Sequence, residues 1–389
     1  MLNSFLLWTA PFFLTLGWLA TRQKQGKESG KPYHKINKEY LTGLNYLLNE
    51  EPDKAVDLFI KMLEVDRDTV ETHLALGHLF RRRGEVDRAI RIHQNLIARP
   101  HLPKTHRVHA LLALGQDYMR AGVLDRAEKL FLEVIEAGEF VNESYRYLLD
   151  VYQQERDWHE AIQIAQRLEM ATNQSMQSYI AHYYCELAQE ARLKVSLEQA
   201  YRYLKKAQAA DKYCARAYLL LGEWDAAHGQ YKQAIKSYKR VVELQIELLP
   251  EIVSPLVDCY DQLGLEGELI DYLYQCLNQH PIISIIVILS KRIQRWRGVS
   301  AATYFLIEHL QLHPSIKGLK RLMELQWELA EGENKYPFQL LKEIAEQLLQ
   351  QKPRYRCEHC GYAGKVLHWL CPSCRVWGTT IPIHGLEGE

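Results

Sequence analysis

The 389-residue sequence predicts a mostly α-helical protein with three parts: one N-terminal transmembrane helix, a curved stack of helical hairpins, and a small C-terminal metal-binding domain. Three observations support this fold class. The first 21 residues carry no charge, alanines recur at intervals of 34 residues, and four of the eight cysteines fall within 18 residues near the C-terminus. The composition agrees, because 47% apolar and 25% charged residues exclude a disordered chain.

Residues 1–21 are expected to form an uncleaved membrane anchor. About 20 helical residues span the roughly 30 Å of hydrocarbon in a bilayer. The following stretch, 22–35, is a basic juxtamembrane linker, which predicts that the bulk of the chain lies on the cytoplasmic side. The alternative is a cleaved signal peptide. That requires a basic start and a small residue before the cleavage point, where this chain has Trp18.

The middle of the chain repeats a helical hairpin. Alanines lie 34 residues apart in three pairs: Ala55 and Ala89, Ala127 and Ala161, and Ala200 and Ala234. Twelve positions before each alanine is a small or apolar residue, which lets the two helices of a hairpin approach closely. One hairpin cannot bury its faces alone, so successive hairpins must stack. The expected array covers 36–350, with repeats at about 36–69, 70–103, 108–141, 142–175, 181–214, 215–248 and 250–283 and degenerate ones over 284–350.

This pattern resembles the tetratricopeptide repeat, most clearly over 72–97 and 111–138. Such arrays hold a peptide or partner protein on the surface lined by the first helix of each hairpin. At these positions, the side chains that favour a partner's carboxylates are His78, Arg81, Arg82, Gln116, Arg120 and Arg192. The alternative is that these arginines are solvated and complement the helix dipole at helix ends.

The C-terminal segment, 353–389, holds two Cys-x-x-Cys pairs, Cys357 with Cys360 and Cys371 with Cys374. Two such turns separated by ten residues predict a closed tetrahedral cage of four thiolates. Structural disulfides are disfavoured by a reducing cytosol, and a thioredoxin-like redox pair by the lack of a βαβ pattern. Spacing alone does not separate iron from zinc. Since 37 residues cannot build a sufficient core, the ion is expected to stabilise the fold.

Aromatic and basic residues alternate in the same segment, at Arg354, Tyr355, Arg356, Tyr362, Trp369, Arg375 and Trp377. Nucleic-acid binding is disfavoured, because 48 basic and 48 acidic side chains leave no basic excess over the whole chain. The aromatic side chains are expected to pack against the last repeat instead.

No catalytic motif is complete. His159 and Glu160 begin an H-E-x-x-H pattern, but position 163 is Gln. No Gly-Lys pair is followed by Ser or Thr, and no G-x-S-x-G sequence occurs. A four-thiolate cage also leaves no open coordination position for a substrate. The sequence therefore predicts a binding protein that is not an enzyme.

The order of anchor, repeat array and paired cysteines resembles the lipopolysaccharide assembly protein B family of Gram-negative bacteria, most specifically over 76–97 and 352–387. The resemblance implies a single-pass protein of the inner membrane that faces the cytosol. It implies an adaptor that promotes degradation of the LpxC deacetylase by the FtsH protease and scaffolds other lipopolysaccharide assembly proteins.

The resemblance further implies an antagonist of the YejM/PbgA type at the membrane, and a rubredoxin-like terminal domain. In that domain Cys357, Cys360, Cys371 and Cys374 would bind iron, with zinc as the alternative. Two other functions stay open on the sequence: a rubredoxin-like electron carrier on a repeat scaffold, and a general peptide-binding cochaperone.

Overall fold

The computed structural model describes residues 70–194, 196–386 and 388, together with Thr42, Asn45, Tyr46, Lys54, Ala55 and Leu58. The expected anchor (1–21), the basic linker (22–35) and most of the first expected repeat (36–69) lie outside these residues. The chain divides into two compact units, residues 1–141 and 142–389. Within the described residues, no helix combines the length and apolar character needed to cross a membrane.

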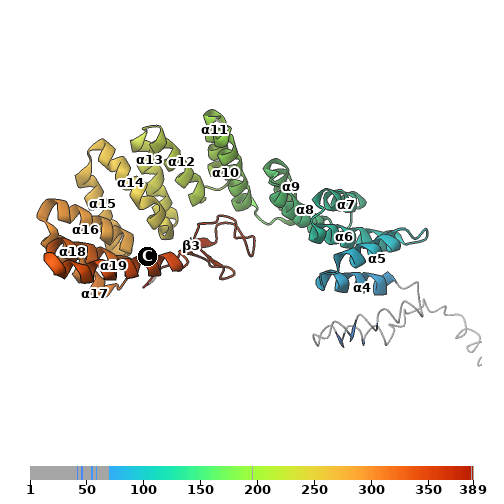
Figure 1. Ribbon diagram of the computed structural model, residues 1–389. Helices are drawn as coiled ribbons and strands as arrows, with labels where there is room; N and C mark the ends of the chain where they lie inside the picture. The colour runs from blue at the N-terminus through green and yellow to red at the C-terminus, as the bar shows by residue number, and fades with distance from the viewer. Residues whose placement is uncertain are drawn as a thin grey trace, which may run out of the picture. The chain divides into compact units, whose positions relative to one another are not determined.

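The described part of the first unit contains two helical hairpins (Figure 1): α4 (Val70–Arg82) with α5 (Val86–Ile97), and α6 (Lys104–Ala121) with α7 (Leu124–Ala137). In each hairpin a glycine on the first helix lies against a ring on the second. A β-carbon placed on Gly115 would lie only 2.6 Å from the ring of Phe131. The small residues of the repeat therefore mark real points of close helix approach.

The second unit stacks six hairpins, which Figure 1 shows in sequence order. They are α8 (Val141–Glu155) with α9 (Trp158–Thr172), α10 (Gln177–Leu193) with α11 (Leu197–Ala210), α12 (Ala215–Ala227) with α13 (Tyr231–Leu244), α14 (Leu249–Leu263) with α15 (Glu266–Gln279), α16 (Ile283–Arg297) with α17 (Val299–Leu312), and α18 (Ile316–Leu329) with α19 (Lys335–Gln351). The last two hairpins are complete, although the repeat pattern fades in their sequence.

The C-terminal segment forms a small metal ribbon, residues 353–386, with three short antiparallel strands. The strands are β1 (Tyr355–Cys357), β2 (Ala363–Gly364) and β3 (Thr380–Pro382), and their order in the sheet is β2-β1-β3. Tyr355 pairs with Gly364 on one side and with Pro382 on the other. The helical repeat array and the cysteine-rich terminal domain confirm those parts of the predicted fold class.

Candidate metal centre

The four cysteines of the metal ribbon converge on one point. Their Sγ atoms all lie within 4.8 Å of one another, and no other group of three or more such ligands occurs among the described residues. The Sγ atoms of Cys357 and Cys374 are 3.7 Å apart, as are those of Cys360 and Cys371. A tetrahedral ion with metal–sulfur bonds of about 2.3 Å has sulfur–sulfur edges of about 3.8 Å. The sulfur positions therefore fit one ion, iron or zinc.

Both Cys-x-x-Cys pairs use the same backbone turn. The N–H of Gly361 donates to the carbonyl of Cys357, and the N–H of Arg375 donates to the carbonyl of Cys371, both at 2.9 Å. The donating residue has a positive φ in each turn, +77° at Gly361 and +56° at Arg375. Glycine adopts this conformation freely, whereas arginine does so only where the surrounding fold enforces it. Gly361 directly follows the first Cys-x-x-Cys pair in the sequence and marks its turn, whereas Arg375 after the second pair gives no such sign.

The environment of the sulfurs suits a structural ion. Cys357 and Cys371 are buried, whereas Cys360 is exposed at the surface of the ribbon. The Oγ1 of Thr379 lies 3.2 Å from the Sγ of Cys357, within reach of a hydrogen bond that orients this ligand. Four protein ligands fill a tetrahedral coordination shell, so a bound ion has no position left for a substrate.

Trp377 attaches the metal ribbon to helices α8 and α10 of the second unit. Its indole N–H donates to the Oε1 of Gln153 on α8 at 2.9 Å. Its ring stacks on His182 of α10, with centroids 5.0 Å apart, and meets Tyr183 edge-on at 5.9 Å. Trp377 keeps only 7% of its surface exposed, so it acts as a buried anchor for the ribbon.

Further contacts extend this attachment over successive hairpins. The guanidinium of Arg216 on α12 lies over the rings of Trp369 and Trp377, at 5.6 and 5.7 Å. The hydroxyl of Tyr355 donates to the Oε1 of Glu251 on α14 at 2.7 Å. The expectation that the ribbon aromatics pack against the last repeat is therefore wrong for these side chains. The chain folds back after α19, and Trp377 enters a site formed by α8–α10.

His182 is neutral at physiological pH in this attachment site. Burial, and then the neighbouring charge of Arg216, lower the pKa of His182 to about 3. A neutral imidazole stacks on Trp377 without the cost of burying a charge. The sequence offered no direct sign of this site, because His182 and Tyr183 occupy positions that repeat proteins also use for their cores.

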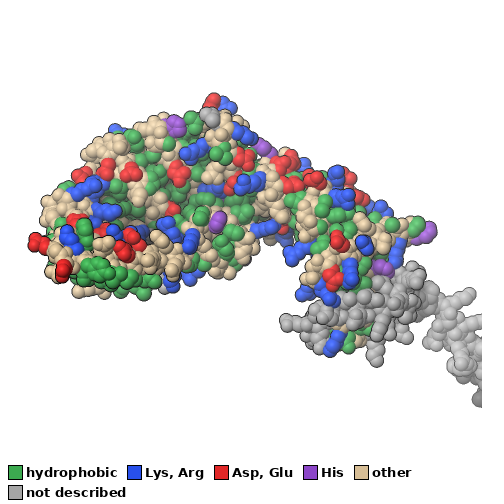
Figure 2. Space-filling view, in the orientation of Figure 1, with side chains coloured by type: hydrophobic (Ala, Val, Ile, Leu, Met, Phe, Trp, Pro, Cys, Tyr) green, Lys and Arg blue, Asp and Glu red, His purple; other side chains and the backbone are tan. Residues whose placement is uncertain are grey.

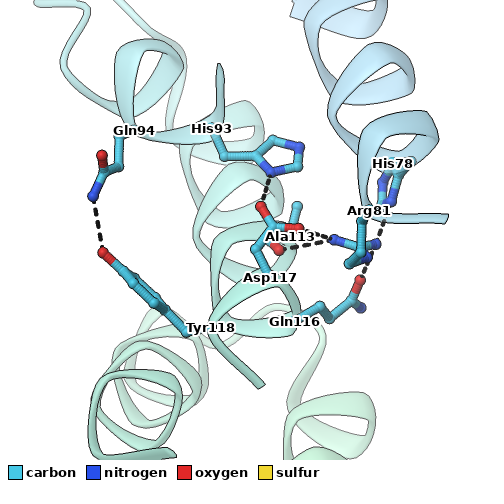
Figure 3. Close-up of polar contacts among 8 residues, drawn as sticks. All are labelled: His78, Arg81, His93, Gln94, Ala113, Gln116, Asp117 and Tyr118. Atoms are coloured by element: carbon cyan, nitrogen blue, oxygen red, sulfur yellow. Dashed lines mark hydrogen bonds and ion pairs between the residues drawn. The ribbon is translucent and has the colours of Figure 1, made fainter. Parts of the chain in front are cut away.

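The six residues expected to bind a partner fall into two groups. Figure 3 shows that three of them, His78, Arg81 and Gln116, meet in one cluster of the first unit. The other three, Arg82, Arg120 and Arg192, are exposed. The guanidinium of Arg192 lies 5.6 Å from the ring centre of Trp224.

Arg81 belongs to a buried charge network (Figure 3). Its guanidinium donates to the Oδ1 of Asp117 at 2.7 Å and to the Oε1 of Gln116 at 2.6 Å. Asp117, which is fully buried, also accepts a hydrogen bond from the Nδ1 of His93 at 2.5 Å. Burial, and next the charge of Arg81, lower the pKa of His78 to about 4. The network joins α4, α5 and α6, and the sequence pattern did not single out Asp117 or His93.

These features define a tetratricopeptide-repeat protein with a terminal four-cysteine metal ribbon. Residues 355–382 match the family described as a rubredoxin metal binding domain. Residues 72–106 and 112–175 match tetratricopeptide repeat families. Among solved structures, the crystal structure of MamA is similar with a TM-score of 0.34 and 20% identity, over 44% of this chain and 94% of that chain.

Full-length relatives give the particular family. The chain is 38% identical over 379 residues to lipopolysaccharide assembly protein B of Escherichia coli (strain K12), covering 97% of each chain. It is 34% identical over 389 residues to the protein of the same name from Haemophilus influenzae, again covering 97% of each. The chain belongs to the lipopolysaccharide assembly protein B family.

Proposed function

We propose that this protein is a membrane-anchored adaptor that regulates lipopolysaccharide synthesis at the cytoplasmic face of a bacterial inner membrane. In this proposal it brings the LpxC deacetylase to the FtsH protease and so promotes LpxC degradation. The observation that carries the proposal is the relationship to lipopolysaccharide assembly protein B over 97% of the chain. That length includes the repeat array and the metal ribbon.

The architecture supports an adaptor that is not an enzyme. Helical repeats present an extended surface to partner proteins, and their own chemistry is binding. The four cysteines would hold one iron or zinc ion in a closed shell, which favours a structural role. The ion would fix the ribbon that Trp377 attaches to α8 and α10.

The proposed anchor, residues 1–21, would act through local concentration. Confining the adaptor and the FtsH protease to one membrane raises their effective concentration without any new contact. A YejM/PbgA-type membrane regulator would oppose the adaptor at this anchor, and other lipopolysaccharide assembly proteins would be recruited by the repeat array.

Deleting residues 1–21 tests the tethering step. In cells that express the deletion variant at the native level, we expect the half-life of LpxC to lengthen several-fold. An unrelated single transmembrane helix of the same orientation, fused before residue 22, should restore normal turnover. Pulse-chase labelling of LpxC measures both. Normal LpxC turnover without any membrane segment would contradict the tethering role.

A further inference from the structure

The last helix of the array, α19, leaves an apolar stripe exposed. Tyr336, Leu340, Ile344 and Leu348 follow one another at intervals of four residues, which places them along one side of the helix, and Leu341 lies beside them. Tyr336 keeps 70% of its surface exposed, and the other four side chains keep 42–48%. Figure 2 shows hydrophobic side chains gathered at the end of the second unit where α17, α18 and α19 lie (Figure 1).

Other second helices of the array carry charges at exposed positions with this spacing. On α7 and α11 the exposed residues four apart are all charged: Asp125, Lys129 and Glu133, and Glu198, Arg202 and Lys206. The end hairpin of a repeat array normally presents polar side chains to water, because no further hairpin covers it. The apolar stripe of α19 therefore departs from the rest of the array and indicates an interaction surface.

The stripe is complementary to a second copy of itself. In an antiparallel pair of α19 helices centred on Lys342, Tyr336 faces Leu348 of the partner subunit. Leu340 faces Ile344 of the partner subunit in the same pair, and both contacts occur twice, as a two-fold symmetric interface requires. Lys342 lies two positions from Leu340 and from Ile344, which is about 200° around a helix, so it lies on the opposite side of α19.

The charges of α19 favour this pairing over contact with a membrane surface. A helix that lies on an anionic membrane carries Lys and Arg on its polar face, toward the headgroups. In α19, Lys335 is instead engaged with α18, where its Nζ lies 4.5 Å from the ring centre of Trp327. The charge nearest the stripe is Glu343, which accepts a hydrogen bond from Gln339 at 3.0 Å. In the antiparallel pair it faces Leu341 of the partner subunit, so the two Glu343 carboxylates do not meet.

We propose that α19 is a self-association surface, at which two copies of this chain pair through their apolar stripes. The exposed fractions correspond to roughly 500 Å² of surface in each copy, at about 200 Å² for a whole side chain. Two copies together then bury about 1,000 Å², which is at the lower end of specific interfaces. Pairing is therefore a reversible equilibrium. It is independent of the proposed role in LpxC degradation, because it rests on α19 alone.

Sedimentation velocity of the full-length, metal-loaded protein in mild detergent tests the surface, at protein concentrations from about 1 to 100 μM. We expect the protein mass per particle to rise with concentration toward two copies. L340E with I344E places four carboxylates in the paired interface and should raise the dissociation constant at least about tenfold. M170E with L193E adds the same charges at exposed apolar positions of α9 and α10 and should leave it unchanged. If the first double variant unfolds, Y336E repeats the test.

Photo-crosslinking locates the contact. Benzoylphenylalanine at position 340 should form a covalent dimer, with the link mapped by mass spectrometry to α19 of the partner subunit near Ile344. A protein that stays monomeric up to about 100 μM would overturn the proposal, as would a dimer that L340E with I344E leaves unchanged. Links to a different segment of the dimer, or links in bacterial membranes only to lipid or to another protein, would overturn it as well.

Discussion

Asp117 shows how a single buried charge organises the first unit. Its carboxylate has no exposed surface, and it accepts hydrogen bonds from Arg81 and His93 on two other helices. From its position in the repeat, Arg81 was expected to lie on the surface lined by the first helix of each hairpin. There it was expected to bind a carboxylate of a partner protein. The sequence could not show that the carboxylate it binds is its own protein's Asp117, 36 residues away, because that pairing depends on how two repeats stack.

Replacing Arg81 should destabilise the first unit. R81M leaves the Asp117 carboxylate buried without the arginine that pairs with it, so we expect the free energy of unfolding to fall by about 3 kcal/mol. R82M, which changes the exposed neighbour, should alter it by less than about 0.5 kcal/mol. Urea unfolding of the full chain measures both. A loss of less than about 0.5 kcal/mol from R81M would show that the Arg81 network contributes no stability.

A second prediction for a single residue concerns His182 and the dependence of the protein's stability on pH. Its pKa is about 3 in the folded protein, below the ordinary value of 6.5 expected after unfolding. As pH falls below 6.5, the unfolded chain therefore takes up a proton that the folded chain does not. Stability from this residue is complete above pH 6.5 and is lost as pH falls toward 3.

The comparison with H182Q isolates that effect, since glutamine does not titrate. Between pH 6.5 and pH 5, the wild type should lose about 1.6 kcal/mol more stability in total than H182Q. Taking the difference between the two proteins removes the shared effect of protonating other groups, including the cysteines. Parallel stability curves for the two proteins would contradict the burial of a neutral His182.

At the scale of the element, the repeated hairpin depends on glycines at helix crossings. A β-carbon on Gly222 of α12 would lie 2.6 Å from the ring of Tyr238 on α13. Gly267 of α15 offers a matched contrast, because a β-carbon there meets nothing within 4 Å. The pattern of small residues was readable from the sequence because Gly77, Gly115 and Gly222 mark the same close approach in three of the repeats.

These two glycines should respond in opposite directions to alanine. We expect G222A to lower the free energy of unfolding by about 1–3 kcal/mol through overpacking against Tyr238. G267A should be neutral or gain up to about 1 kcal/mol, because alanine favours a helix. Differential scanning calorimetry of the full chain compares them. A gain in stability from G222A would mean that a β-carbon at position 222 fits between α12 and α13 without overpacking.

For the whole molecule, the sequence predicted the parts better than their assembly. The hairpins and the four metal ligands follow from local spacing, which is why Cys357 and Cys374 could be assigned from the sequence alone. The attachment of Trp377 to Gln153 joins residues 224 positions apart. A single tryptophan carries no mark of which distant helix it packs against, so this contact required the fold.

The contacts of Trp377 with the helices also determine which surface the proposed adaptor can offer to a partner. The ribbon covers part of the surface formed by the first helices α8, α10, α12 and α14, through Trp377, Arg216 and Tyr355. The metal ion would hold the ribbon in the shape that fits this surface. Replacing one of the four cysteines should therefore disturb the contact between the ribbon and these helices, as well as the metal site itself.

The most direct test of the adaptor role is reconstituted proteolysis. Purified FtsH in lipid membranes is supplied with LpxC and ATP, and the rate of LpxC loss is measured with and without this protein. We expect the full-length protein to accelerate degradation several-fold, and C357S, which loses a metal ligand, to fail. An unchanged rate of LpxC degradation with the intact, metal-loaded protein present would contradict the account.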